Sequence, residues 1–217
     1  MKVMKRKSSA ISNIKNLVLE NIITYFKEYI VVTICFVIGI IAGVIFINNL
    51  SDNQSSEIAT YISSFLETLK TDVNINYLEL LKNSLMQNLI LVLTLWFVGA
   101  TLIGIPLVFG IILFRGFCLG YTISAIIHIL GISKGIMFVL TTMFLHNLIF
   151  IPAIIALAVS GIRLYQTVVK NRNSESIKFA ILKHSIFALI IMLLLALSSI
   201  IEIFVSTNLF SVCINFF

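Results

Sequence analysis

Apolar stretches long enough to cross a lipid bilayer alternate along this chain with short polar segments. A transmembrane helix needs roughly 20 mainly apolar residues, and the alternation predicts five such helices. They are expected over residues 29–47, 85–114, 117–130, 136–161 and 186–205. The pattern therefore predicts an all-α membrane protein whose single transmembrane domain occupies residues 29–206.

The nearly continuous apolar stretch over residues 85–130 is divided by one proline and one arginine. A straight helix over residues 85–114 would measure roughly 45 Å, more than the hydrophobic thickness, so a kink is expected at Pro106. A charge is costly at the bilayer centre and much less so at the interface, which places a cytoplasmic turn at Arg115-Gly116. Two alternatives stay open: a turn near Pro106 with Arg115 inside the membrane, and four or six spans instead of five.

The first polar segment, residues 1–28, is basic and carries apolar residues at helical spacing. This combination predicts a cytoplasmic amphipathic helix on the inner leaflet. The alternative is a disordered basic tail before the first span.

The segment over residues 51–84 is acidic and is expected outside the cell membrane. The residues from Ser51 to Gln54 have the spacing of a capping box, and Ile58, Ile62 and Phe65 follow on one face of the predicted helix. This apolar face either covers the membrane surface or the mouth of the bundle, or docks an extracytoplasmic partner.

The distribution of charge predicts the orientation. Twelve of the fifteen basic residues fall on the side that the five-span arrangement makes cytoplasmic, many of them in a loop over residues 162–185. Basic residues beside spans are retained in the cytoplasm. The N-terminus is therefore expected inside and a short tail, residues 207–217, outside. Since the net charge of +6 is spread beside apolar spans, nucleic acid is not an expected partner, whereas membrane lipids are.

No pattern of catalytic, cofactor-binding or metal-binding residues is present in the sequence: a serine-histidine hydrolase motif, a zinc-binding histidine pair and a glycine-rich phosphate loop are all missing. Cys35, Cys118 and Cys213 lack metal-ligand spacing and are interpreted as packing residues. No enzymatic activity and no cofactor are expected.

Other residues inside the spans are interpreted through helix packing. Gly39 with Gly43, and Gly116 with Gly120, have the small-xxx-small spacing that lets helices approach closely, and they leave open a homo-oligomer.

Polar residues in the later spans need partners in lipid. His146 and Asn147 precede a kink expected at Pro152, and we interpret them as a helix-helix hydrogen-bonding pair. A proton or ion relay would need His128 and Glu202 in line with them. Glu202 is either solvated at the outer interface or hydrogen-bonded within the bundle or to a partner.

Five short motifs occur in order between residues 95 and 152. They are Leu95-Trp96-Phe97-Val98-Gly99, Gly104-Ile105-Pro106, Phe114-Arg115-Gly116, Gly120-Tyr121-Thr122 and Asn147-Leu148-Ile149-Phe150-Ile151-Pro152. In their order and spacing they resemble the stage II sporulation protein M family. One departure is Leu145, where relatives often have a proline.

The resemblance implies a non-enzymatic integral membrane protein of the engulfment complex. Such a protein anchors two cell-wall hydrolases, stage II sporulation proteins D and P, at the septum, where peptidoglycan is thinned during endospore formation. The alternative from another class is a permease subunit that pairs with a separate ATPase through the basic loop. An intramembrane enzyme is a third hypothesis. The candidate helix-packing or partner-contact residues are Gly39, Gly43, Ile58, Ile62, Phe65, Trp96, Gly99, Pro106, Arg115, Gly116, Gly120, His146, Asn147, Pro152 and Glu202.

Overall fold

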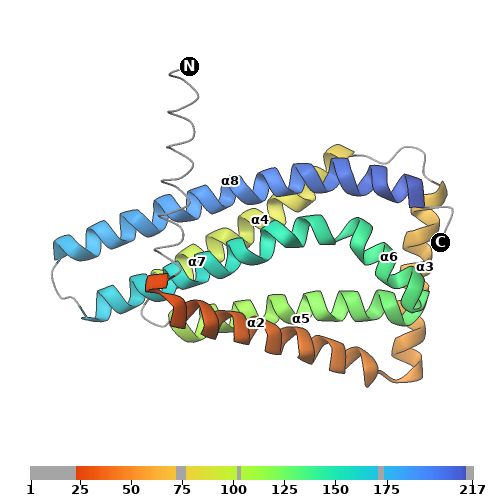
Figure 1. The fold of residues 1–217 in the computed structure, drawn as a ribbon, viewed down its shortest axis with the longest axis horizontal. Helices are drawn as coiled ribbons and strands as arrows, with labels where there is room; N and C mark the ends of the chain where they lie inside the picture. The colour runs from red at the N-terminus through yellow and green to blue at the C-terminus, as the bar shows by residue number, and fades with distance from the viewer. Residues whose placement is uncertain (1–22, 72–76, 102–103, 171–173, 214–217) are drawn as a thin grey trace, which may run out of the picture.

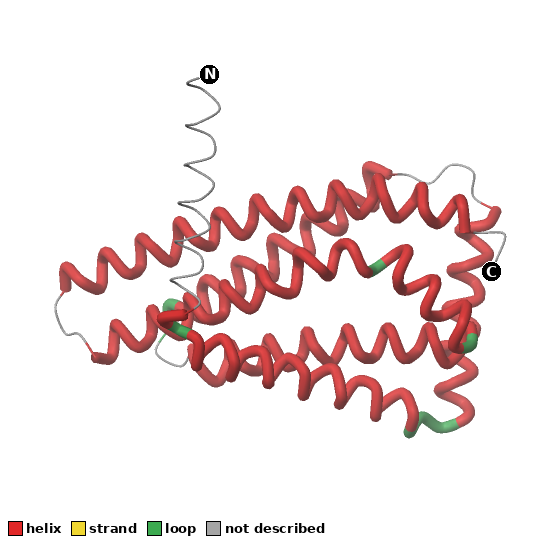
Figure 2. Tube along the Cα trace, viewed as in Figure 1, coloured by secondary structure: helices red, strands yellow, loops and turns green. Residues whose placement is uncertain are grey.

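The computed structural model describes residues 23–71, 77–101, 104–170 and 174–213, and within these ranges every regular element is a helix (Figures 1 and 2). In chain order the helices are α2 (Phe26–Asn48), α3 (Asp52–Thr71), α4 (Tyr77–Gly99), α5 (Gly104–Leu130), α6 (Ile132–Thr142), α7 (Phe144–Lys170) and α8 (Ser174–Cys213). The predicted leader over residues 1–28 lies mostly outside the described residues.

Five of these helices are long and apolar enough to cross a membrane. The corresponding segments are Phe26–Asn48, Leu78–Gly99, Gly104–Leu130, Phe144–Val169 and Ser176–Ile201. The prediction of an all-α chain with five long apolar helices is confirmed, and the chain is a multi-pass membrane protein.

The prediction of a turn at Arg115-Gly116 was wrong, and so were the predicted span boundaries 85–114 and 117–130. Helix α5 runs without interruption past both residues, and the chain turns instead between Gly99 and Gly104. Pro106 is the third residue of α5, where the missing backbone N–H has no helical partner to lose. The proline therefore helps to begin α5 and does not bend a longer helix, as the kink expected there would require.

Other predicted boundaries also differ from those in the structure. A break at Met143 separates α6 from α7, so the fourth predicted span, 136–161, is divided between two helices. The segment 162–185, expected as a basic loop, is almost wholly the end of α7 and the beginning of α8. A change in hydropathy marks the membrane surface, but a helix satisfies its own backbone and can continue into water. Pro152 lies inside α7, and a kink at this residue stays a prediction.

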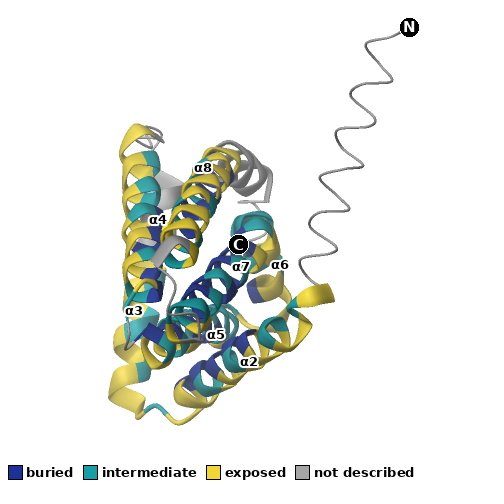
Figure 3. Ribbon diagram, turned by 90° about the vertical axis from the view of Figure 1, so that its left-hand side faces the viewer, coloured by how far each residue is buried: buried dark blue, intermediate teal, exposed yellow. Residues whose placement is uncertain are grey.

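Helix α7 is the central element of the bundle, since more than half of its apolar segment is buried, 56%. Its own Ile154 and Leu157 are fully buried, and the four other long apolar helices each contribute a fully buried side chain: Val32, Leu95, Ile112 and Leu195. Figure 3 shows buried residues on the faces that the helices turn toward one another and exposed residues on the outer faces. The outer faces of α2 and α8 are rich in exposed isoleucine, leucine and valine, as expected for lipid contact.

The long helices run side by side, so the connections gather at two ends of the bundle (Figure 1). One end holds the beginning of α2, the α4–α5 turn and the junction of α7 with α8, and we call it the basic end because Lys27, Arg163, Lys178 and Lys183 lie there. The other end, the α3 end, holds α3 and α6. Any site must lie within the packed bundle or at one of these two ends.

Candidate functional site

Helices α2 and α5 cross at the two glycine pairs that the sequence singled out. A Cβ atom added to Gly39 would overlap the carbonyl oxygen of Leu113, and one added to Gly116 would overlap that of Phe36. Gly43 and Gly120 face the opposite helix in the same way one turn further along. The glycines thus lie inside the chain's own bundle, where the two backbones touch.

A second glycine crossing joins α4 to α7. A Cβ on Gly99 would lie 2.8 Å from the Cα of Gly161. The ring of His184, from α8, covers the same point, with its Nε2 atom 3.2 Å from that Cβ position. Gly99, which the sequence proposed as a packing residue, therefore lies at the contact of three helices.

A buried group of hydrogen-bonded polar side chains holds α4 against α8. The Ser84 hydroxyl and the Asn88 amide both donate to the Ser199 hydroxyl, at 2.9 and 2.8 Å. Asn88 is 7% exposed and Ser199 is fully buried, so water does not solvate these two side chains, whereas Ser84 is partly buried. Since hydrogen bonds between helices are favourable in lipid, this network fixes the register of the two helices.

Polar side chains from α5, α7 and α8 meet around the ring of Phe150. The His146 ring stacks on Phe150 at 5.1 Å between centroids and meets the Ser198 hydroxyl at 3.1 Å from Nδ1. The partly buried Arg115 guanidinium lies 5.7 Å from the centroid of the same phenyl ring, a distance suited to a cation–π contact. Asn147, expected to pair with another helix, donates its side-chain amide to the carbonyl of Met143 in the preceding turn, 2.9 Å away.

Two further hydrogen bonds attach α8 closer to the basic end. The Trp96 indole N–H donates to the Ser185 hydroxyl at 3.0 Å, and the Ser160 hydroxyl meets His184 Nδ1 at 2.9 Å. His184 is 2% exposed. Its Nε2 atom is turned toward Gly99 and the backbone of Trp96 and makes no hydrogen bond with the described residues.

At the α3 end, helix α3 lies across the mouth of the bundle. Ile58 and Ile62 are partly buried and line a cavity of about 460 Å³ that α5 and α6 complete. At the beginning of α3, the backbone N–H of Ser51 donates to the side-chain oxygen of Gln54 at 3.3 Å. Of the two uses left open for the apolar face of this helix, the structure has Ile58 and Ile62 covering the bundle.

The two histidines of the hypothetical relay, His128 and His146, lie in different surroundings. His128 is exposed at the end of α5, whereas His146 lies in the cluster around Phe150. The side chains of Phe65 and Glu202 lie outside the described residues. In the part of the chain that the structure describes, no three histidine, cysteine or acidic residues gather in a way that could hold a metal ion, and Cys35 and Cys118 are unpaired.

Sequence reasoning missed the residues that make the buried hydrogen bonds, above all Asn88, Ser160, His184 and Ser199. Ser160 is a single polar residue in an apolar run, whereas Asn88, His184 and Ser199 each stand beside another polar residue. The available signal is a polar residue within a predicted membrane helix, because lipid itself offers such a group no partner. The sequence could not show which groups pair, since the pairs lie between 24 and 115 residues apart.

Comparison with known proteins completes the description of the chain. A search of the curated proteins and a search of the solved structures found no match. The model of one family, described as Stage II sporulation protein M, matches residues 32–207. That range takes in the whole of α3 to α7 and most of α2 and α8, which confirms the resemblance inferred from the five motifs. The chain belongs to the stage II sporulation protein M family.

Proposed function

We propose that this protein is a non-enzymatic membrane scaffold that holds cell-wall hydrolases of the engulfment complex, stage II sporulation proteins D and P, at the sporulation septum. Family membership supports a role in sporulation. A scaffold needs stable helix packing and an accessible surface on the side of its partners. It needs no reactive group of its own.

The packed interior is the observation that carries the proposal. One cavity is lined by α7, α8 and the beginning of α2, and another by α3, α5 and α6; these linings belong to opposite ends of the described bundle, whose helices are drawn in Figure 1. Between them, Leu95, Ile112, Ile154 and Leu157 are almost completely buried. A permease subunit would need a polar route between the two ends, and the buried polar groups instead bond to one another across helix contacts.

The outer face of α3 is the surface that we assign to the partners. Its exposed residues Asn53, Thr60, Ser64 and Glu67 recur at helical spacing. Because Ile58 and Ile62 face the bundle, the polar stripe faces away from it. On the orientation inferred from charge, with the N-terminus inside, this stripe faces the wall compartment, where the hydrolases act.

Affinity purification of the full-length protein from sporulating cells tests the assignment. Thr60→Arg combined with Ser64→Arg should reduce recovery of the two hydrolases at least tenfold, because two long charged side chains would occupy the contact face. Lys178→Glu, a charge change at the basic end, is the matched control and should leave recovery unchanged. Equal recovery with the α3 variant would exclude this face. Solute flux through the purified protein in vesicles would favour the permease alternative.

A further inference from the structure

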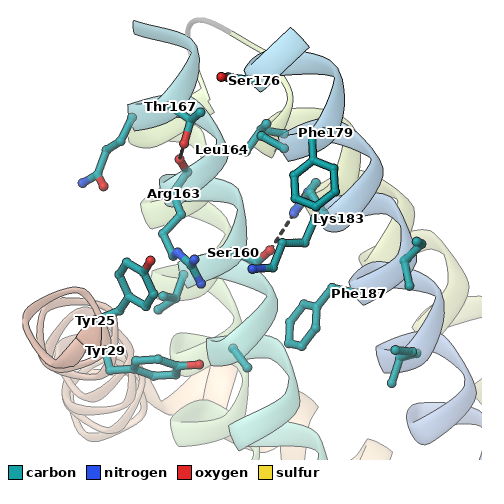
Figure 4. Close-up of a pocket in the computed structure, with 17 residues that line it drawn as sticks. Tyr25, Tyr29, Ser160, Arg163, Leu164, Thr167, Ser176, Phe179, Lys183 and Phe187 are labelled. Atoms are coloured by element: carbon teal, nitrogen blue, oxygen red, sulfur yellow. Dashed lines mark hydrogen bonds between the residues drawn. The ribbon is translucent and has the colours of Figure 1, made fainter. Parts of the chain in front are cut away.

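A cavity of about 640 Å³ opens at the basic end between α7, α8 and the beginning of α2 (Figure 4). Arg163 comes from α7, Lys183 from α8, and Tyr25 and Tyr29 from the α2 end. Its volume falls in the range of ordinary ligand sites, about 300–1,000 Å³. The proposed scaffold role gives this cavity no function.

The charged part of the cavity is cationic. Arg163 and Lys183 line it, and among the described lining residues none is aspartate or glutamate. The Arg163 guanidinium lies over the Tyr25 ring, 3.4 Å from its centroid, which holds it in place while its charge stays uncompensated. Neither cation forms an ion pair with a described residue. An arginine held by a ring and a nearby lysine, neither paired with a carboxylate of the described residues, favour an anionic ligand.

The wall along α8 is largely apolar and faces the lipid, and the neutral polar residues Ser160, Gln166, Thr167, Ser176 and His184 also line the cavity. Phe179, Ile186 and Ile190 line the cavity along α8, and their side chains are 70%, 53% and 51% exposed on a helix that crosses the membrane. Figure 4 shows the α8 residues, among them Phe179 and Phe187, opposite Arg163 and the tyrosines. The cavity is thus open sideways to hydrocarbon, so its ligand has both a charged and an apolar part.

The two cations lie at a common depth. Arg163 precedes the end of α7 at Lys170 by seven residues, about 10 Å. Lys183 follows the beginning of α8 at Ser174 by nine residues, about 14 Å. Lys170 and Lys178 lie beyond them toward the connection of α7 with α8. We place this end at the aqueous side because basic residues flank membrane spans there, which puts Arg163 and Lys183 near the level of lipid phosphates.

We propose that this cavity binds an anionic phospholipid, with its phosphate between Arg163 and Lys183 and an acyl chain along Ile186 and Ile190. Free phosphate shares the charged part of this chemistry, but it would leave the open apolar wall without a ligand. The bound lipid would fill the gap between α7 and α8 and join them to the beginning of α2. This inference rests on the cavity itself and not on the proposed scaffold role.

The chain's single tryptophan provides the measurement. Trp96 bonds to Ser185, next in sequence to His184, which lines the cavity, so a quencher on a bound lipid would lie near the indole. The full-length protein is placed in phosphatidylcholine nanodiscs. Phosphatidylglycerol or phosphatidylcholine carrying a doxyl group near the top of one acyl chain is then titrated in.

The expected result is quenching by phosphatidylglycerol at a much lower mole fraction than by phosphatidylcholine. Each basic side chain at a membrane surface favours anionic lipid by about fivefold, so the pair predicts a preference of roughly 30-fold. Lys183→Gln should lower the preference about fivefold, and Arg163→Gln with Lys183→Gln should abolish it. Lys178→Gln, on the same helix and outside the cavity lining, should retain it. Circular dichroism checks that each variant is folded, and Lys183, being exposed, can be replaced without loss of packing.

Three results would overturn the proposal. They are equal quenching of the unmodified protein by both lipids, an equal loss of preference in Lys178→Gln and Lys183→Gln, and release of the quenching lipid by inorganic phosphate but not by sodium chloride of the same ionic strength. The last result would assign the cavity to free phosphate instead of a lipid.

Discussion

The closeness of α2 and α5 predicts a large difference between two alanine substitutions in one helix. At Gly116 a Cβ would overlap the carbonyl oxygen of Phe36 and lie 3.2 Å from the backbone nitrogen of Ile40. Both atoms belong to the backbone of α2 and cannot rotate away, so the two helices must separate. At Gly110, also in α5, a Cβ would meet nothing within 4 Å, which makes Gly110→Ala the matched control.

The magnitude follows from this geometry. Both substitutions gain the same helix propensity, up to about 1 kcal/mol, and this gain cancels when the variants are compared. What remains is the overpacking at Gly116, about 1–3 kcal/mol. Gly116→Ala should therefore unfold more easily than Gly110→Ala by that amount, with the denaturant slope unchanged.

Unfolding by denaturant in mixed micelles, followed by the fluorescence of Trp96, measures the difference. The indole lies on α4 and bonds to α8, so it reports on the bundle without touching the α2–α5 crossing. Equal midpoints for the two variants would refute the close approach of α2 to α5, because only Gly116→Ala places a methyl group against the backbone of the other helix.

Two further predictions follow from the buried network and from the distribution of charge. Ser199→Ala removes the common acceptor of Ser84 and Asn88 and should destabilise the bundle by about 1–2 kcal/mol. The double variant with Asn88→Leu should lose less stability than the sum of the losses of the two single variants. Additive losses would count against the shared hydrogen bond. In a cysteine-free background, a membrane-impermeant maleimide should label Asn53→Cys in intact cells and Lys178→Cys only after permeabilisation, and the reverse pattern would contradict the N-inside orientation.

Hydropathy predicts helices in this chain more reliably than their ends. The five long apolar helices could be expected because lipid admits few backbone structures other than helices. The end of α7 and the beginning of α8 could not be predicted in this way. Helix α7 continues to Lys170 and helix α8 includes Lys178, so charged residues that lower the hydropathy do not end the helix. The break at Met143 carries no glycine or proline that would have indicated it.

The packing contacts were predictable in part. Spacing alone identified Gly39, Gly43, Gly116 and Gly120, because small residues four apart form a flat strip on a helix. Spacing does not say whether such a strip meets another helix of the same chain or a second copy. That choice depends on the three-dimensional order of the helices, which puts α2 beside α5.

The prediction of a turn at Arg115 was wrong although the physical rule on which it rested is correct. A charge at the centre of a membrane helix costs about 2.5–3.5 kcal/mol on insertion scales, and this cost alone favoured an interfacial turn at Arg115-Gly116. Breaking a helix at this point inside an apolar run leaves several backbone N–H and C=O groups unpaired, each worth several kcal/mol in hydrocarbon.

The chain avoids that larger cost by turning where its sequence suits a turn. At Gly104 a Cβ would overlap the carbonyl oxygen of Val98, so the tight turn there needs glycine, and Pro106 follows in the first turn of the new helix. Arg115 then remains in the middle of α5, partly buried, with its guanidinium facing the ring of Phe150. The backbone therefore decides where the helix ends, and the arginine is accommodated by a contact that only the folded bundle provides.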